Sequence, residues 1–230
     1  MKDFTSLEYS LGVTFENKDL LKQACVHRSY LNEHPSFELD HNERLEFLGD
    51  AVLEIVVTEF LYNKFSDKPE GELTNLRASL VNAKMLATVA NELEIESCLY
   101  LSKGEAKDKN TKARSFILAD SVEAIIGAIY LDQGVRAAKK FITNKILSHL
   151  DGVMEQQLYL DPKSTFQERV QEKFSVTPHY SVIAESGPDH DKVFEVGVYV
   201  GDELVARGSG SSKQEAQVEA AVAALKKKKW

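Results

Sequence analysis

The spacing of apolar residues changes once along this chain, near residue 151, and this change limits the folds that it can adopt. Before it, apolar residues recur at helical spacing, as in residues 44–62 and 117–131. Beyond residue 161 the spacing differs, because apolar residues at every second position of 193–200 give the period of two that is typical of a strand. The sequence therefore predicts a helical domain followed by a small domain that mixes helices and strands.

The same patterns predict where the elements lie. In the first domain we expect helices at residues 20–26, 44–62, 73–93, 117–131 and 137–150, with exposed loops at 66–71 and 103–114. The second domain reads as α-β-β-β-α: a helix opened by the capping-box spacing of Ser164 and Gln167, strands at 180–185, 193–200 and 204–208, a Gly/Ser turn at 208–212, and an alanine-rich helix to 229. The expected boundaries are 1–152 for the first domain, 153–160 for a linker and 161–230 for the second domain.

Composition restricts the class of protein. With 43% apolar and 28% charged residues among 230, the chain is typical of a soluble globular protein. We expect no membrane partner, because no apolar run approaches the ~20 residues that cross a bilayer and the start does not resemble a secretory signal. Cys25 and Cys98 fit no metal or disulfide spacing, which favours a reducing cytoplasm and buried, inert thiols. The formal charge of −8, taken alone, argues against a nucleic-acid partner.

Three acids share one face of the helix predicted near residues 43–62. At 100° per residue, Glu43, Glu46 and Asp50 fall within roughly 60° of one another. Like charges at these spacings weaken a helix. Taken alone, this group is explained equally well by a solvated helix face and by a binding site.

Asp120 and Glu123 are harder to explain as surface residues, because the helix that carries them is apolar on most sides. An unpaired buried carboxylate is costly, so a divalent cation would compensate if this helix faced the first one. Gly127, one turn beyond Glu123, would let another backbone approach closely. Carboxylates without histidine or cysteine favour Mg²⁺ or Mn²⁺ over Zn²⁺, and they serve phosphate chemistry.

The second domain offers a place for phosphates. Its Gly/Ser turn puts backbone N–H groups and Lys213 at the start of a helix. Alanines at 216, 220, 223 and 224 give that helix a thin face, which can lie close on a sheet. In an α-β-β-β-α module of this size, the arrangement resembles a double-stranded RNA-binding domain, which recognises duplex shape.

Both halves together resemble bacterial ribonuclease III over essentially the whole chain. The motifs that carry the resemblance are NERLEFLGDA at 42–51, LADSVEAIIG at 118–127, LRASLV at 76–81 and HRSY at 27–30. The resemblance implies an all-α endonuclease domain followed by a small α+β double-stranded RNA-binding domain. It also implies a cytoplasmic homodimer that hydrolyses double-stranded RNA with Mg²⁺ or Mn²⁺, leaves 5′-phosphates and short 3′ overhangs, and processes ribosomal and some messenger RNAs.

Site residues follow from the same resemblance. The implied metal ligands are Glu46, Asp50, Asp120 and Glu123, with Asp50 and Glu123 the two expected to be catalytic. Glu43 and Glu70 match additional active-site acids, and Phe47 matches a residue that packs into the partner subunit. His27 reads as structural. The implied RNA contacts are Ser164, Gln167, Glu168, His190, Ser212 and Lys213.

One departure and two alternatives remain. Gln214 stands where the family usually has a second basic residue, so the affinity of the second domain for RNA is expected to be modest unless the run Lys226 to Lys229 compensates. A binding-only protein with an inactive nuclease domain would have lost at least one metal-position acid, and none is lost. A helical hydrolase of small phosphorylated molecules would leave the second domain unexplained.

Overall fold

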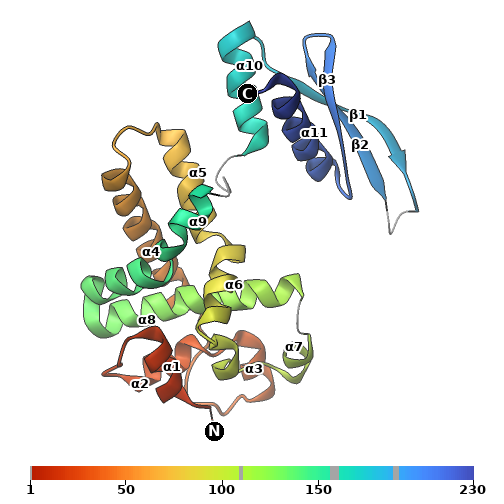
Figure 1. Cartoon of the computed structure of the whole chain (residues 1–230). Helices are drawn as coiled ribbons and strands as arrows, with labels where there is room; N and C mark the ends of the chain where they lie inside the picture. The colour runs from red at the N-terminus through yellow and green to blue at the C-terminus, as the bar shows by residue number, and fades with distance from the viewer. Residues whose placement is uncertain (1, 109–110, 156–160, 189–191) are drawn as a thin grey trace. The chain divides into compact units, whose positions relative to one another are not determined.

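The computed structural model describes residues 2–108, 111–155, 161–188 and 192–230. The chain divides into two compact units, Met1–Tyr159 and Leu160–Trp230 (Figure 1). Within the described residues, the first unit is built from helices and the second from two helices and a sheet. This confirms the fold class expected from the sequence.

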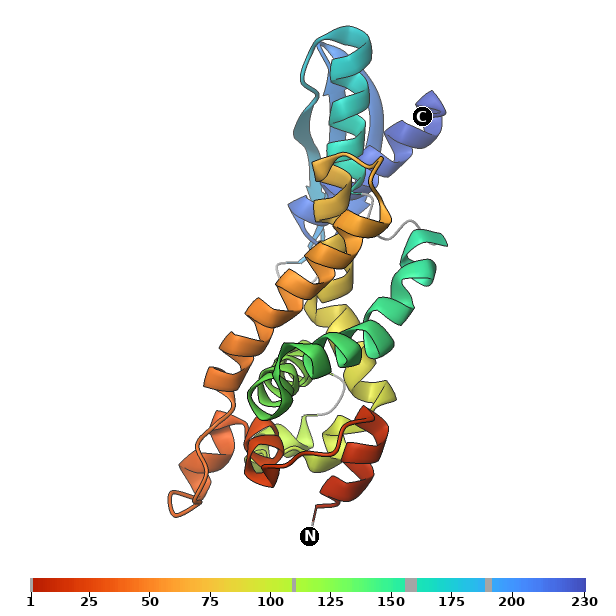
Figure 2. The ribbon, with the colours of Figure 1, turned by 90° about the vertical axis from the view of Figure 1, so that its left-hand side faces the viewer.

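Helices form the whole framework of the first unit. Its elements are α1 (Phe4–Leu11), α2 (Lys18–Ala24), α3 (Arg28–Glu33), α4 (Glu43–Lys64), α5 (Glu70–Val81), α6 (Ala83–Glu92), η1 (Ile95–Cys98), α7 (Lys103–Lys107), α8 (Lys112–Lys145), η2 (Leu147–His149) and α9 (Leu150–Glu155). The two longest, α4 and α8, pack directly against each other. Figure 2 shows α4 in orange along its whole length.

Two expectations for this unit are wrong in detail. The helix expected at 73–93 is two helices, because Asn82 is extended and its side chain accepts a hydrogen bond from the Met85 N–H to cap α6. The loop expected at 103–114 contains α7 and the first turn of α8, where Arg114 is buried. By contrast, the break expected between 131 and 137 is confirmed, because the backbone of Gly134 is non-helical at φ 78° and ψ −179° and kinks α8 between two helical parts.

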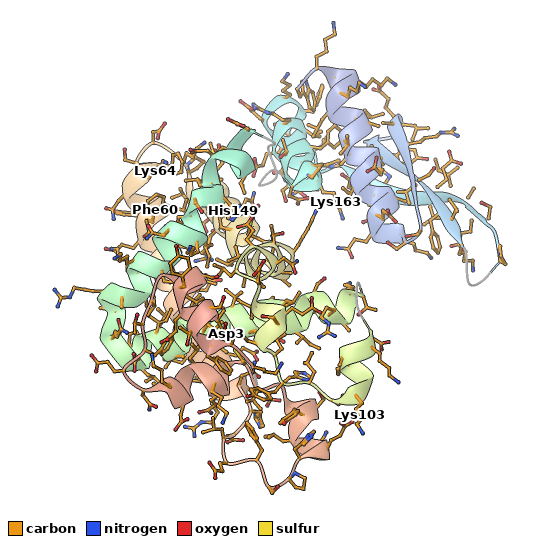
Figure 3. The ribbon with its side chains drawn as sticks, turned by 60° about the horizontal axis from the view of Figure 1, so that its bottom comes forward. Asp3, Phe60, Lys64, Lys103, His149 and Lys163 are labelled. Carbon is orange, nitrogen blue, oxygen red and sulfur yellow. The ribbon has the colours of Figure 1, made fainter. Side chains whose placement is uncertain are left out.

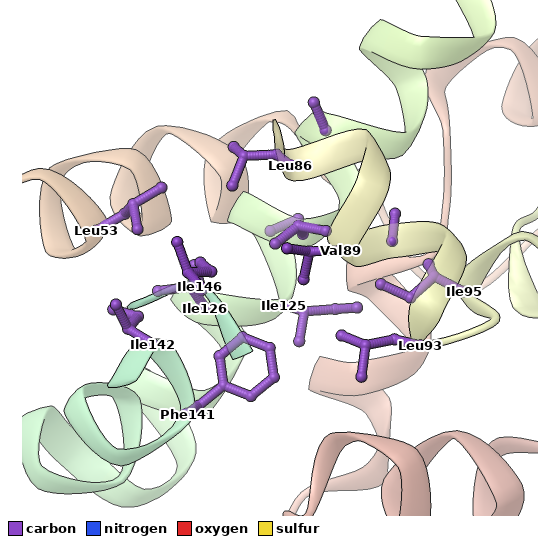
Figure 4. Packing of buried hydrophobic residues seen from close by; sticks show 14 of the residues in the cluster. Leu53, Leu86, Val89, Leu93, Ile95, Ile125, Ile126, Phe141, Ile142 and Ile146 are labelled. Atoms are coloured by element: carbon purple, nitrogen blue, oxygen red, sulfur yellow. The ribbon is translucent and has the colours of Figure 1, made fainter. Parts of the chain in front are cut away.

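The core of the first unit centres on α8. Figure 4 shows Ile125 and Ile126 of α8 packed among side chains of α6 and α4, including Leu86 and Leu53. All four are fully buried. The segment 117–131, which was expected to be apolar on most sides, is therefore mostly buried. Asp120 and Glu123 are the two acids in it. Cys25 and Cys98 are buried free thiols, as expected.

The second unit follows the expected order of elements. It contains α10 (Pro162–Phe174), β1 (His179–Ser186), β2 (Val193–Val200), β3 (Glu203–Gly210) and α11 (Lys213–Lys228). The strands form an antiparallel sheet in the order β1-β2-β3. Both helices contribute to a small core made of Phe166, Val170, Val198, Val205, Ala220, Ala221 and Ala224.

Helix α10 begins earlier than expected. Asp161 is its N-cap and accepts hydrogen bonds from the N–H groups of Lys163 and Ser164, with Pro162 at the first helical position. The predicted capping box at Ser164 is therefore wrong. Proline fits the first turn without losing a hydrogen bond, so the Asp161-Pro162 pair is the stronger start signal.

Helix α11 lies close to β3, and part of the predicted Gly/Ser turn belongs to that strand. Gly208 and Gly210 end β3, and a Cβ on Gly208 would overlap the backbone of Ala216 and Ala220. This confirms that α11 has a thin face. The buried alanines are 216, 220, 221 and 224, whereas Ala223 is half-buried.

Candidate active site

Two glycines let α4 and α8 touch through their main chains. A Cβ on Gly49 of α4 would overlap the carbonyl of Glu123, and one on Gly127 of α8 would overlap the carbonyl of Leu45. Each glycine thus lies against the backbone of the opposite helix. The close approach expected at Gly127 is confirmed, and Gly49 supplies the other half of the contact.

This contact brings acids from the two helices together. Carboxylate oxygens of Glu46, Asp120 and Glu123 all lie within 4.8 Å of one another. All three side chains are half-buried, whereas Asp50, one turn beyond Glu46, is exposed. The structure therefore joins the two acidic groups that the sequence places more than 70 residues apart.

Mutual repulsion is clearest at Glu123. Burial raises the pKa of Glu123 to about 8, and the neighbouring carboxylates of Asp50, Asp120, Glu46 and Glu54 add to the rise. The effect of Asp50 places this exposed acid within electrostatic reach of the cluster. At neutral pH without a cation, Glu123 therefore keeps a proton for much of the time.

Glu46 and Asp120 are likewise acids whose negative charge has no basic partner among the described residues. Burial raises the pKa of both, and the charges of Asp120, Glu43 and Asp50 raise that of Glu46 further. Within the described part of the chain, no lysine or arginine forms an ion pair with any acid of the cluster. Oxygen ligands held this close without a basic partner suit a hard divalent cation such as Mg²⁺.

The pKa of Glu123 predicts how stability depends on pH. In metal-free protein, we expect the contribution of Glu123 to the free energy of unfolding to be largest below about pH 4.5 and to fall as pH rises towards about 8. The reason is that the folded state holds a proton on Glu123 over this interval and the unfolded state does not. Urea unfolding in a chelating buffer at about pH 5 and about pH 8.5 measures the loss. Glu123→Gln should reduce the difference, and an unchanged difference would contradict the assignment.

Glu43 and Glu70 lie outside the cluster. Glu43, at the first residue of α4, is exposed and pairs with Arg28 at 3.4 Å. Glu70 begins α5 and lines a pocket with Thr58 and Arg77, beside the second half of α4. Thr58 is about 18 Å from Glu46 along the helix axis, so this chain does not bring Glu70 to its own cluster.

Phe47 is well placed for contact with another molecule. It is 81% exposed, although it follows Glu46 directly in α4. It lines an open pocket of mixed character, in which Leu20, Leu48 and Leu131 lie beside polar residues such as Gln23 and Arg44. A phenylalanine this exposed, with leucines beside it, favours an interface.

Sequence reasoning missed Glu54 and gave His27 only a structural role. Glu54 lies one turn beyond Asp50, raises the pKa of Glu123 and pairs with Arg77 at 3.0 Å. Its i+4 spacing from Asp50 could have revealed it. His27 lies within electrostatic reach of Asp120, a tertiary proximity that no local pattern encodes.

The exposed face of α10 carries three predicted RNA contacts. Ser164, Gln167 and Glu168 are all exposed. The Ser164 hydroxyl donates to Asp161 at 2.6 Å, which makes it part of the helix cap. Lys163, labelled in Figure 3, instead donates to Gln217 of α11 at 2.7 Å and so links the two helices.

Ser212 and Lys213 lie at the start of α11. Ser212 is the N-cap and accepts from the Glu215 N–H, so its hydroxyl oxygen is partly engaged. Lys213 is exposed, pairs with Glu185 of β1 at 3.2 Å and lies over the ring of Phe194. His190, the remaining predicted contact, lies outside the described residues.

The lysine run at the end of α11 has structural partners. Lys227 donates to the Val205 carbonyl at 2.9 Å, and Lys228 pairs with Glu203 at 3.7 Å. Lys229 ends the helix in a left-handed conformation, which brings Trp230 onto the ring of Phe166. At least half of the run is therefore tied to the domain's own packing.

Comparisons with known proteins agree with this geometry. A family model described as Ribonuclease-III-like matches residues 17–150, and one described as Double-stranded RNA binding motif matches residues 162–228. The protein named Ribonuclease 3 of Campylobacter fetus is 43% identical over 221 residues, covering 96% of each chain. That of Natranaerobius thermophilus is 45% identical over 229 residues, covering 98% of this chain and 96% of the relative.

A solved structure extends the comparison to the fold. The crystal structure of the nuclease domain of ribonuclease III from Campylobacter jejuni matches with a TM-score of 0.56 and 41% identity. The match covers 65% of this chain and 97% of that chain. Among the described residues of this chain, no helix is long and apolar enough to cross a membrane.

A helical unit with facing carboxylates, joined to a module that binds duplex RNA, defines a two-domain endoribonuclease. The chain belongs to the ribonuclease III family. Its activity is therefore the endonucleolytic hydrolysis of double-stranded RNA. The alternatives of a hydrolase of small molecules and of a binding-only protein find no support in these comparisons.

Proposed function

We propose that Glu46, Asp50, Asp120 and Glu123 hold divalent metal, with Mg²⁺ as the ion used and Mn²⁺ able to replace it. The observation that carries this proposal is the cluster of three half-buried carboxylates whose oxygens lie within 4.8 Å of one another. Asp50 is exposed at the edge of the cluster and within electrostatic reach of Glu123, so it is available to both metal and substrate. Asp50 and Glu123 are the proposed catalytic residues.

Bound divalent ions can generate a water nucleophile near neutral pH and stabilise the charge on the leaving oxygen. The chain's contribution is to hold the acids at fixed separation, because the Gly49–Gly127 contact sets how far apart α4 and α8 lie. The proton that Glu123 retains without metal leaves when a cation binds, so cation binding and proton release are coupled. Glu43, at the exposed start of α4, is proposed to lie near the scissile strand.

The second unit provides the contacts that bind duplex RNA. Ser164, Gln167 and Glu168 are proposed to face one minor groove and His190 the next, with Ser212 and Lys213 on the phosphates between them. The exposure of the α10 residues and of Lys213 supports this arrangement. Lys213 must exchange Glu185 for phosphate when RNA binds. Since Gln214 adds no charge, we expect modest affinity from this unit alone.

We further propose that the protein acts as a homodimer through α4. Phe47, Ile55 and Tyr62 are large apolar side chains on this helix, and all three are more than 60% exposed. A symmetric interface requires a surface that complements itself, and the exposed Phe47 together with the pocket that it lines with Leu20 and Leu131 is suited to that requirement. Glu70 lies remote from the cluster of its own chain, so any role for it in catalysis depends on such an assembly.

The proposed products are 5′-phosphates with short 3′ overhangs, and the proposed setting is the cytoplasm, where the enzyme would process ribosomal and some messenger RNA precursors. The test of metal dependence is cleavage of a long RNA duplex by the full chain with and without Mg²⁺, with single-stranded RNA of the same sequence as control. We expect cleavage of the duplex in Mg²⁺ and none in chelator. Equal cleavage in chelator would refute the metal site, and equal cleavage of the single strand would refute the substrate.

A further inference from the structure

Glu185, near the end of β1, forms ion pairs with lysines from two other parts of the second unit. Its Oε1 atom lies 3.2 Å from the Nζ of Lys213, the first residue of α11. Its Oε2 atom lies 3.6 Å from the Nζ of Lys192, which directly precedes β2. Lys213 lowers the pKa of Glu185 and Lys192 adds to the effect, so the carboxylate is charged at neutral pH. One carboxylate therefore joins β1 to the start of β2 and to the start of α11.

The register of the sheet places Glu185 on the side that the helices cover. Glu185 lies directly opposite Phe194 of β2, and directly opposite residues share a face of the sheet. Phe194 shares that face with Val198, which belongs to the core of the unit. The Nζ of Lys213 lies 5.4 Å from the centre of the Phe194 ring. Lys213 is thus held by the carboxylate of Glu185 and the ring of Phe194.

The pair of Lys213 and Glu185 is open to solvent, because their side chains are 57% and 38% exposed. An exposed ion pair contributes little to stability, so the fold does not depend on this contact. The contact does change the charge that a ligand meets. A phosphate that binds Lys213 must displace the carboxylate or accept a negative charge beside it.

The other acid near the start of α11 has local partners. Glu215 accepts from the Ser211 N–H at 2.8 Å and from the Ser211 hydroxyl at 2.5 Å. Such a contact with the residues just before a helix is ordinary capping. Glu185 belongs to a strand and reaches α11 only through the fold. Of these two acids, Glu185 is therefore the one that neutralises Lys213.

We propose that Glu185 sets the affinity of the second unit for duplex RNA, because its carboxylate occupies on Lys213 the place that an RNA phosphate takes. This inference rests on the proposed contact of Lys213 with RNA. Each phosphate that a protein neutralises contributes roughly one unit to the slope of log affinity against log salt concentration. Glu185 therefore lowers both the affinity and its dependence on salt. Substrate and product duplexes present the same backbone shape to this unit, so Glu185 also favours the release of products.

The experiment measures binding of the full chain, in chelator and at several salt concentrations, to an RNA duplex of about 16 base pairs, the span of one such unit. Glu185→Gln keeps the shape of the side chain and removes its charge. We expect it to bind the duplex about threefold more tightly at low salt, a factor within the range for an exposed ion pair. The slope against log salt should become steeper by up to about one unit.

A matched control lies on the opposite face of the same sheet. Glu195 of β2 pairs with Arg207 of β3 at 3.2 Å, and these side chains are 34% and 57% exposed, close to the values for Glu185 and Lys213. Because Glu195 follows Phe194 directly in the strand, its side chain points to the other face. Glu195→Gln removes the same charge and should bind the duplex as the wild type does. Both variants should keep the unfolding midpoint of the wild type.

A second background tests whether Glu185 acts through Lys213. We expect Lys213→Gln alone to weaken binding and to lower the salt slope by about one unit. In a chain that carries Lys213→Gln, the further change Glu185→Gln should give a smaller gain in affinity than it gives in the wild type. An equal gain in both backgrounds would overturn the inference.

Three other results also contradict the proposed roles. Unchanged or weaker binding by Glu185→Gln would overturn the inference, and weaker binding would make Glu185 a residue that holds Lys213 in place for RNA. Equal gains from Glu185→Gln and Glu195→Gln would reduce the effect to net charge and overturn it as well. If Lys213→Gln binds the duplex as tightly as the wild type, the proposed contact of Lys213 with RNA itself fails.

Discussion

Replacement of Glu123 by glutamine is expected to abolish cleavage of double-stranded RNA in Mg²⁺ while leaving RNA binding and the fold intact. Glutamine has the shape of the protonated carboxyl group that predominates at Glu123 without metal, since burial and the neighbouring acids raise its pKa to about 8. The variant therefore resembles the metal-free protein at neutral pH. What it loses is the negative charge that a divalent cation requires.

The expected loss of rate is large. Stabilisation of developing charge at a metal centre is worth several kcal/mol, which corresponds to about a thousandfold in rate. Single-turnover cleavage of an end-labelled duplex measures the loss, and a gel-shift assay in chelator measures binding. Turnover at the wild-type rate would remove Glu123 from the site.

A matched control lies on the same pair of helices. Glu59 of α4 pairs with Lys139 of α8 at 2.7 Å, and both side chains are about half exposed. It lies near Phe60 and Lys64, labelled in Figure 3, towards the far end of α4 from Glu46. Since an exposed ion pair contributes at most about 1 kcal/mol to stability, Glu59→Gln should cleave as the wild type does.

Gly49→Ala is expected to damage both the fold and the activity, although it adds a single methyl group. The added Cβ would overlap the Glu123 carbonyl of α8 and lie 2.8 Å from the Gly127 nitrogen. Because both obstacles are backbone, neither can rotate away, so the two helices must move apart. We expect a loss of about 3 kcal/mol in the free energy of unfolding, at the upper end for overpacked cores.

Activity should fall further than stability alone explains. Separation of α4 and α8 moves Glu46 away from Asp120 and Glu123, so Mn²⁺ affinity should fall even at temperatures where the variant is folded. Urea unfolding and Mn²⁺ titration at low temperature provide the two measurements. The control is Gly152→Ala in α9, where a Cβ meets nothing within 4 Å and alanine should be neutral or stabilise the helix by up to about 1 kcal/mol. Equal behaviour of the two variants would contradict the close-contact argument.

The site could be predicted from the sequence largely because its chemistry is unfavourable elsewhere. Asp120 and Glu123 are conspicuous in an apolar helix. Gly127 indicates that another backbone lies nearby, but it does not show which element that backbone belongs to. The partner helix could only be inferred from its own acids. The sequence therefore predicted the two acidic groups. The structure identified Gly49 as the residue of α4 that lies against α8 and so brings the two groups together.

What the sequence failed to reveal depends on long-range contacts or on competition between local signals. The position of His27 depends on the hydrogen bond that its N–H donates to the Tyr100 carbonyl, more than 70 residues away. The cap at Asn82 divides a segment that apolar spacing predicts to be one helix. The cap at Asp161 starts α10 before the capping box expected at Ser164. Such competitions are decided by local hydrogen bonds between a short polar side chain and the backbone, which the spacing of apolar residues does not reveal.

The Gly49–Gly127 contact also bears on how such a chain can change over generations. Because main chain meets main chain there, the separation of the two acid-bearing helices does not depend on which apolar side chains fill the surrounding core. Leucine, isoleucine and valine can replace one another around α8 without altering the distance between the acids. Relatives with 43–45% identity therefore have a wide range of cores open to them, provided that two positions stay without a side chain.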